Sequence, residues 1–366
     1  MTGSSSARTL ITYENAAAWD QPAWRAWDAY VQAHPAATFC HLSGWGQAIE
    51  RAWGHRPCHM RVEQDGQVRA VLPLFHVSSR VFGSMLVSSP NAVYGGILAD
   101  DAAAYQMLLD AAAKLAEKLG VDYLELRDSR DPAGVDNAPI TIPEAQWPRK
   151  DLYVTFEHPL VADEEALMKS LPRDVRTMIR KGIKNGLTGE LGREAFLDDF
   201  YDVYATSVRN LGTPVFSKKL FAELLRAFPE QSDILLIRQE GKIAGGVMSF
   251  YFRGQVLPYY GGAYPEFYRS GINNFMYWEL MTRSATRGCH LFDFGRSKLN
   301  TGAYEFKRGW GMNMRPLPYR FFLVRAARLP DLNPANPKYE MMINCWKKLP
   351  LGVTKVIGPR IVKYLP

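Results

Sequence analysis

Charged and aromatic side chains that could take part in catalysis are concentrated in one stretch, Asp293 to Gly311. This stretch, DFGRSKLNTGAYEFKRGWG, holds four glycines, two arginines and two lysines among several aromatic residues. It follows an apolar run, Cys289 to Phe292, that is typical of a buried strand. A surface loop rarely needs so many aromatic side chains, and a core rarely tolerates so many charges. The combination indicates the rim of a binding or catalytic site.

A second candidate segment, YRSGINNF, opens a long helical pattern. The N-terminus of a helix presents free N–H groups and a partial positive charge, which attract phosphate or carboxylate. Gly271 would let a ligand approach the backbone, and Arg269 adds a positive charge. Asn273 and Asn274 offer further hydrogen bonds. We therefore predict that these four residues bind an anionic ligand or cofactor.

Both segments belong to the second copy of an internal repeat. The stretches RVEQDGQVRAVLPLF and LIRQEGKIAGGVMSFYF each predict a hairpin with an Asp-Gly or Glu-Gly turn. Each copy then carries a Tyr-Gly-Gly, at Tyr94 and at Tyr260, followed by a long helix that ends at a glycine. A strand follows in each case, LELRDS in the first copy and LFDFGRS in the second. The shared order indicates duplication rather than chance.

The two copies differ in their chemistry. The first copy opens its long helix with Asp100 and Asp101, whose negative charges stabilise the helix and would repel an anion. In the second copy the final strand runs into the charged stretch, where Thr301 or Asn300 can cap a short helix. The second copy is therefore the better candidate for the site.

The repeat predicts two domains and a tail. A segment rich in proline and glycine at 131–150 separates the copies. We predict a degenerate scaffold domain at 1–150 and a domain with the active site at 151–325. Residues 326–366 form a basic tail that we expect to dock on the body, with weak contact to the inner membrane surface as the alternative.

Composition limits the class of protein. The chain has 366 residues, is 47% hydrophobic, and carries a net charge of +7 with a pI near 9.1. The sequence contains no run of about 18 apolar residues, which is the length needed to span a bilayer. The N-terminus shows no signal-peptide pattern, so we expect a cytoplasmic protein. Four scattered cysteines predict neither zinc nor disulfides. The positive charge predicts an anionic partner, such as a nucleotide-linked small molecule.

A basic helix precedes the second hairpin. The segment PRDVRTMIRKGIKNG predicts a helix with Arg173, Arg176, Arg180 and Lys184 along one face. This face is either a solvated surface or the wall of a cleft that holds an anion.

With these features the chain resembles the FemAB-like proteins of the GNAT acyltransferase superfamily, in the branch that accompanies exosortase (PEP-CTERM) and exopolysaccharide systems. The resemblance rests on GINNFMYWELM, on DFGRS and on the Phe-Lys-Arg-Gly-Trp run at Phe306, and it covers about residues 35 to 325. It implies an α/β (α+β) fold of tandem duplicated GNAT-like domains, each a mixed central sheet flanked by helices. It also implies transfer of an activated acyl group to an amine.

The resemblance leaves the donor substrate open between acyl-CoA and aminoacyl-tRNA. Fem-type members use aminoacyl-tRNA, and other relatives use acyl-CoA. The phosphate-binding pattern Gln/Arg-x-x-Gly-x-Gly/Ala is not intact here, because Tyr268 and Asn273 replace two of its residues. No long helical hairpin of the kind that several Fem-type enzymes carry is evident. We expect no metal cofactor, and no DNA as a partner.

The resemblance assigns roles to particular residues. Lys307, after Phe306, stabilises the carbonyl oxygen of the acyl group as it becomes anionic. Apart from the resemblance, Asp293 at the end of a strand is a candidate base or amine-orienting group, and its structural alternative is a helix cap or a partner of Arg296. Further substrate-binding candidates are Arg296, Lys298, Tyr260, Tyr304, Phe306 and Trp310.

The main hypothesis is thus an N-acyltransferase or aminoacyltransferase that acts on a cell-envelope or exopolysaccharide precursor. The alternative is a non-catalytic GNAT-fold protein that binds a polysaccharide precursor or RNA.

Overall fold

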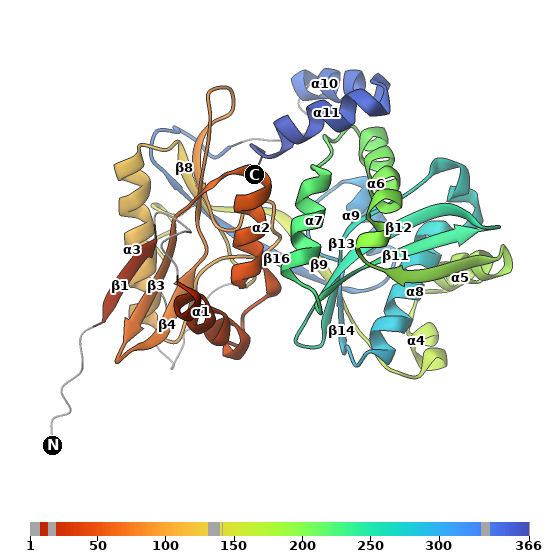
Figure 1. The fold of residues 1–366 in the computed structure, drawn as a ribbon, viewed down its shortest axis with the longest axis horizontal. Coiled ribbons are helices and arrows are strands. Elements are labelled where there is room, and N and C mark those ends of the chain that lie inside the picture. The colour runs from red at the N-terminus through yellow and green to blue at the C-terminus, as the bar shows by residue number, and fades with distance from the viewer. Residues whose placement is uncertain (1–7, 14–19, 131–139, 141, 331–336, 366) are drawn as a thin grey trace. The chain divides into compact units, whose positions relative to one another are not determined.

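The fold of the chain is shown in Figure 1, a computed structural model that describes residues 8–13, 20–130, 140, 142–330 and 337–365. The chain divides into two compact units. Unit 1 contains residues 1–153, 316–331 and 364–366, and unit 2 contains residues 154–315 and 332–363. Residues 131–139 and 141 of the predicted linker lie outside the described residues. The strands β9 (Arg149–Pro159) and β16 (Asn313–Leu323) each begin in one unit and end in the other.

Unit 2 is built on a mixed sheet with the strand order β10, β11, β12, β13, β14 and β9. The bounds are β10 (Leu187–Gly192), β11 (Ser232–Gln239), β12 (Lys242–Phe252), β13 (Gln255–Ala263) and β14 (Leu291–Asp293), with β15 (Ser297–Lys298) paired to β9. Neighbours are antiparallel except β13 and β14, which are parallel. Glu240 and Gly241 have φ of 49° and 77° and form the predicted tight turn of the hairpin.

Helices cover both faces of this sheet (Figure 1). Their bounds are α4 (Glu164–Ser170), α5 (Arg173–Lys184), α6 (Leu197–Leu211), α7 (Lys218–Ala227), α8 (Ile272–Thr286) and α9 (Gly302–Arg308), with short 3-10 helices at η4 (Glu194–Phe196) and η5 (Pro265–Ser270). Two adjacent glycines of β12 show the layering, because their positions face opposite sides. Gly245 faces Ile272 of α8, and Gly246 faces Phe200 of α6. The core on the α8 side also receives α5, through Val175 and Ile179.

The end of the chain forms α10 (Pro337–Lys348) and α11 (Leu351–Val362), which pack on α6 within unit 2. Lys355 of α11 bonds to Asp202, and Arg209 donates to Leu349 O over 3.2 Å. Gly358 packs closely against Val215, because a Cβ added at Gly358 would lie 2.9 Å from the backbone nitrogen of Val215. In the part of the chain that the structure describes, every helix is too short or too polar to cross a bilayer.

Unit 1 contains two sheets, ordered β1-β3-β4-β7 and β16-β8-β6-β5-β2. The strands are β1 (Thr9–Tyr13), β2 (Arg56–Pro57), β3 (His59–Gln64), β4 (Gln67–Leu72), β5 (Phe75–Ser79), β6 (Gly83–Val87), β7 (Leu98–Ala99) and β8 (Tyr123–Arg127). The helices are α1 (Gln21–Ala33), η2 (Phe39–His41), α2 (Ser43–Trp53) and α3 (Ala102–Leu119). The predicted first-copy hairpin is β3 and β4, whereas the hairpin β5–β6 has no counterpart in the sequence prediction.

Two buried histidines of unit 1 lie among aromatic and backbone groups. The ring of His59 packs 4.8 Å from that of Phe75 and 5.8 Å from that of Trp24, and burial lowers its pKa to about 3. Burial also lowers the pKa of His41 to about 4, although hydrogen bonds with Thr38 and Gly96 oppose the shift. Both side chains are therefore neutral in the folded protein at physiological pH.

Mild acid should destabilise the fold through these two histidines. The unfolded chain binds their protons near pH 6.5, and the native state binds them only near pH 4 or below, so stability is lost as pH falls through that interval. At pH 5 each histidine should lower the free energy of unfolding by up to about 2 kcal/mol. Urea unfolding at pH 7.5 and pH 5 measures this change. His59→Phe should remove about half of it, the control His290→Gln none, and equal stability at both pH values would contradict the prediction.

Candidate active site

The candidate site lies in unit 2, at the point where the parallel strands β13 and β14 separate. These strands pair only through Gln255 with Leu291 and Val256 with Phe292. Beyond Val256, β13 continues to Ala263, while β14 ends at Asp293 and turns away. We call this point the fork of unit 2. A sheet that opens between parallel strands at their carboxyl ends is a common place for a ligand.

Tyr277 of α8 spans the fork. Its ring lies 4.8 Å from that of Phe294, just after β14, and its hydroxyl would be 3.6 Å from a Cβ added at Gly261 of β13. Burial raises the pKa of Tyr277 to about 12, so the hydroxyl stays protonated at neutral pH and is able to donate a hydrogen bond. It has no hydrogen-bond partner among the described residues. No sequence signal marked this residue, although it lies one helical turn after the predicted Asn273.

Lys307 closes the loop that follows β14. Its ammonium group donates to three carbonyl oxygens, at 2.7 Å from Phe294, 3.0 Å from Gly295 and 3.3 Å from Arg296. Burial of the ammonium lowers the pKa of Lys307 to about 8, the Asp293 carboxylate opposes this shift, and the charge of Arg296 adds to it. The predicted oxyanion donor therefore has all three N–H groups engaged in this structure, with the Arg296 carbonyl the most distant acceptor.

Asp293 is buried, with 2% of its surface exposed. One oxygen, Oδ1, accepts from the Gly295 N–H at 2.8 Å and from the Thr155 hydroxyl. These two hydrogen bonds fix the orientation of the carboxylate. The geometry therefore favours the orienting role for Asp293 over the role of general base.

Aromatic side chains surround this loop. The ring of Phe294 lies 5.5 Å from that of Trp310 and 6.5 Å from that of Phe306, and Tyr277 contacts all three. Two buried polar atoms here, Ser297 Oγ and Trp310 Nε1, have no hydrogen-bond partner among the described residues. Buried polar groups are normally paired, so these two atoms are exceptions at this point of the fold. Ser297 is a second residue that the sequence analysis did not select.

The start of α8 is held against α5. Gly271 has a φ of 88°, and an added Cβ would lie 2.6 Å from the carbonyl oxygen of Met178. The sequence predicted that Gly271 lets a ligand approach the backbone. In the structure the group that approaches Gly271 closely is the backbone of α5. Asn185, at the end of α5, also donates to Ser270 O over 3.2 Å. Helix packing fixes where the first N–H groups of α8 lie.

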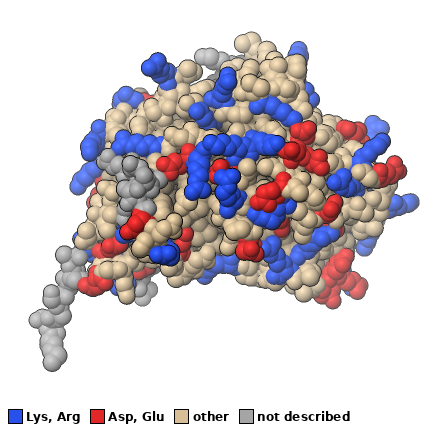
Figure 2. All heavy atoms as spheres, viewed as in Figure 1, with Lys and Arg blue, Asp and Glu red and all other residues tan. Residues whose placement is uncertain are grey.

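Positive charge surrounds this helix start. Arg269 is exposed. Helix α5 carries one carboxylate, Asp174, and five cations, which are Arg173, Arg176, Arg180, Lys181 and Lys184. Within the described ranges, none of these six cationic side chains forms an ion pair. Elsewhere many cations do, and Figure 2 shows basic side chains spread over the face of the molecule with acidic ones between them. The unneutralised cations of α5 make this part of unit 2 suited to an anion.

The structure brings some of the predicted residues together and separates others. Asp293, Arg296, Phe306, Lys307 and Trp310 lie around the loop after β14. Asn273 lies one helical turn before Tyr277, whose ring contacts this loop. Tyr260 lies on the other face of the sheet, where its ring packs 5.0 Å from Phe221 of α7 and 5.9 Å from Tyr204 of α6.

The other predicted residues border the loop after β14. Tyr304 packs 5.6 Å from Phe156, and Lys298 is half-buried on β15. Asn274, like Asn273, is half-buried in the first turn of α8. Thr301 caps α9 through a 3.3 Å bond from Tyr304 N, as the sequence predicted. In the described ranges no group of three acidic, histidine or cysteine side chains could hold a metal ion.

The corresponding point of unit 1 is closed. There the N–H groups of Gly95 and Gly96 both donate to Arg127 O, each over 3.0 Å. The Arg127 side chain is fully buried and pairs with Glu125 at 2.9 Å. In unit 1, backbone bonds therefore join the segments that correspond to the two sides of the fork in unit 2, and a buried ion pair lies beside them.

Part of the chain, which includes the candidate site, matches a known family model. Residues 173–308 match the family model described as an acetyltransferase (GNAT) domain. This range runs from the first residue of α5 to the last of α9 and includes every predicted site residue except Trp310. The domain is that of a transferase, which confirms the predicted class of enzyme.

Solved structures agree in fold over most of the chain. FemX has a TM-score of 0.67 at 15% identity, with 87% of this chain and 98% of that chain covered. L-PGS from Bacillus licheniformis gives 0.53 at 14%, covering 93% and 97%. A tandem GNAT protein from the clavulanic acid biosynthesis pathway gives 0.53 at 12%, covering 88% and 100%. The predicted fold class, tandem GNAT-like α/β domains, is confirmed. No curated protein sequence gives a match.

The contact between Gly271 and α5 can be tested with a matched pair of glycines. Gly288, at the other end of the same helical segment, has a φ of 91° and open space around its Cβ position. Gly288→Ala should cost only the backbone strain of about 1 to 2 kcal/mol. Gly271→Ala should cost about 2 kcal/mol more, because its Cβ overlaps the α5 backbone. Urea unfolding measures both, and equal losses would contradict the packing described.

Proposed function

We propose that unit 2 transfers an acyl or aminoacyl group from an activated donor to an amine on a cell-envelope or exopolysaccharide precursor. The observation that carries this proposal is the fork, where the protonated Tyr277 hydroxyl and the charged Lys307 face one loop. The names of two structural neighbours support the envelope part, since L-PGS is a lysylphosphatidylglycerol synthetase and FemX is a FemAB-type protein.

The chemistry follows from the groups present. Attack of an amine on the acyl carbonyl places negative charge on the carbonyl oxygen, and a cationic donor in a dry site stabilises that charge by about 3 kcal/mol. In our proposal the carbonyl oxygen replaces the Arg296 carbonyl as the third acceptor of Lys307, because that bond is the longest at 3.3 Å. Asp293 keeps the lysine charged and holds the loop. As the bond from the acyl carbon to the leaving group breaks, Tyr277 gives its hydroxyl proton to the leaving group and takes up the proton that the attacking amine loses.

The donor binds, in this proposal, at the start of α8 and along α5. Helix α5 has twelve residues and is about 18 Å long. Its row of cations is therefore longer than one diphosphate group. This length favours an aminoacyl-tRNA over an acyl-CoA as the donor. Arg269 and Asn273 would then hold the phosphates nearest the acyl group, and Arg180 and Lys184 the more distant ones.

Substitution of Lys307 tests the catalytic assignment. Lys307→Met should lower the rate of transfer at least 100-fold, on the scale of one lost oxyanion donor, and should leave donor binding nearly unchanged. Arg308→Met, an exposed neighbour on the same helix, is the control and should retain the wild-type rate. Because the pKa of Lys307 is about 8 and the charged form is required, the wild-type rate should fall as pH rises above 8.

Two outcomes of that experiment would count against the proposal. A Lys307→Met enzyme within threefold of wild type would exclude the oxyanion role. A protein that binds its ligand but transfers nothing with either class of donor would be the non-catalytic binder.

The donor can be identified by the salt dependence of binding. If the donor is aminoacyl-tRNA, Arg180→Gln/Lys184→Gln should weaken tRNA binding and lower the slope of log K against log salt by about one to two. The matched control Lys219→Gln/Lys242→Gln removes two exposed charges elsewhere in unit 2 and should change little. Ribonuclease should also abolish transfer. Retained transfer with acetyl-CoA after ribonuclease treatment would instead identify acyl-CoA.

A further inference from the structure

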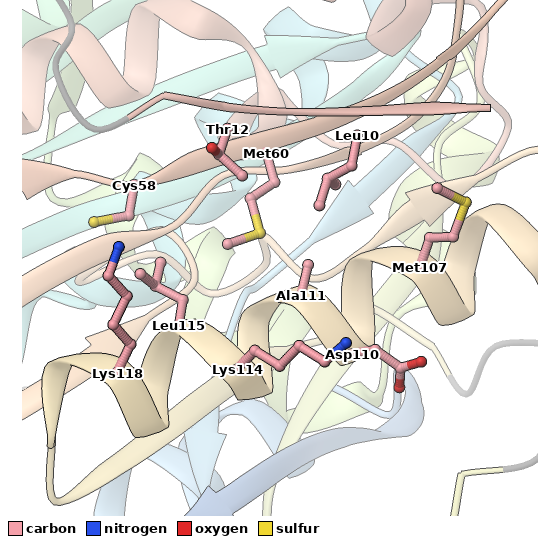
Figure 3. Close-up of a pocket in the computed structure, with 10 residues that line it drawn as sticks. All are labelled: Leu10, Thr12, Cys58, Met60, Met107, Asp110, Ala111, Lys114, Leu115 and Lys118. Atoms are coloured by element: carbon pink, nitrogen blue, oxygen red, sulfur yellow. The ribbon is translucent and has the colours of Figure 1, made fainter.

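A groove in unit 1 is lined by none of the residues of the candidate active site. It has a volume of about 410 Å³ and runs between α3 and the strand β1, with β3 at its base (Figure 3). Its walls are largely apolar, and the residues that matter here are Leu10, Met60, Met107, Ala111 and Leu115.

The groove exists because α3 and β1 do not fill the space between them. Met107, Ala111 and Leu115 are spaced by four residues and form an apolar stripe beside the fully buried face of the helix. On the opposite wall, β1 is at the edge of its sheet and presents Leu10, which is 36% exposed. Thr12, two residues on, faces the same side. An apolar channel with one open side is left.

The dimensions of the groove suit one unbranched alkyl chain. From Met107 to Lys118 the helix advances about 16 Å. At about 30 Å³ for each water-sized group, a volume of 410 Å³ holds roughly a dozen such groups, which is one chain and not two. Met60 and Met107 line it with flexible thioethers, which adapt to the shape of a ligand.

The rim of the groove is positively charged. Lys114 and Lys118 of α3 border it, together with a single carboxylate, Asp110. Asp110 accepts a 2.7 Å bond from the amide of Gln106. Lys114 forms no ion pair with a described residue, and Figure 3 shows the Lys118 side chain rising from α3 toward Cys58. With Lys114 unpaired among the described residues, the rim attracts an anionic headgroup.

We propose that this groove binds a medium-chain fatty acid anion, with the alkyl chain between α3 and β1 and the carboxylate near Lys114 and Lys118. This site goes beyond the proposed transfer reaction, because it lies wholly in unit 1 and uses none of the reacting groups.

Titration calorimetry of the full chain with octanoate, decanoate and dodecanoate, each below its micelle-forming concentration, tests the proposal. We expect one site per chain. Each pair of added methylene groups should strengthen binding roughly 15-fold, since one methylene is worth about 0.8 kcal/mol, or fourfold. Decanol, which has the same chain without the charge, should bind at least threefold more weakly than decanoate.

Variants locate the ligand. Ala111→Phe fills the groove from the helix and Thr12→Trp fills it from β1, so each should weaken decanoate binding at least tenfold. Ala103→Phe, an exposed site on the same helix outside the groove, is the control and should bind normally. Lys114→Gln/Lys118→Gln should weaken binding of decanoate threefold or more and leave binding of decanol unchanged.

Three results would overturn the proposal. These are the absence of saturable decanoate binding, binding that neither Ala111→Phe nor Thr12→Trp reduces, and binding to phosphatidylglycerol vesicles without binding to free decanoate. Thermal unfolding of each variant shows whether it is folded, and the two filling variants approach the groove from separate elements.

Discussion

The hydrogen bonds of the Lys307 ammonium with three successive carbonyl groups hold the site of unit 2 in place. Three neighbouring carbonyls rarely converge on one point, and they do so here because Gly295, with φ of 68°, turns the chain back on itself. The interaction ties α9 to the end of β14 and thereby fixes Phe294 against Tyr277. It also requires burial of a charge, which is unfavourable, and the Asp293 carboxylate compensates part of that desolvation.

The fork depends on the sheet being left incomplete. β14 has only three residues, so it offers β13 few backbone partners, and the rest of β13 must find its neighbours elsewhere. On one face α6 packs against Gly262, and on the other Tyr277 reaches Gly261. The glycines allow both helices to approach closely. The separation of β13 from β14 is therefore maintained by the packing of α6 and α8 on the two faces of the sheet, and not by flexibility of the strands.

The sequence predicted most of the elements and part of the site. Local signals were sufficient for the Glu240–Gly241 turn and the Thr301 cap, because each depends on neighbouring residues. The placement of Tyr260 was not predictable in the same way. The register of β12 against β13 shifts between Met248 and Ser249, and the face that a side chain occupies depends on such a shift. The contact of Gly271 with α5 and the reach of Tyr277 across the fork are tertiary, and no local pattern encodes them.

The two units carry different residues at equivalent positions, and these residues explain the difference in their chemistry. When LELRDS is aligned with LFDFGRS, Glu125 corresponds to Asp293 and Arg127 corresponds to Gly295. In unit 1 the arginine supplies its own buried cation to the glutamate, and its carbonyl bonds to the Tyr-Gly-Gly segment and closes the gap. In unit 2 the corresponding residue, Gly295, has no side chain. The cation there comes from a separate helix, α9, and donates to three backbone carbonyls. Among the described residues, the combination of a glycine at this position and a lysine from another helix is found in unit 2 and not at the equivalent point of unit 1.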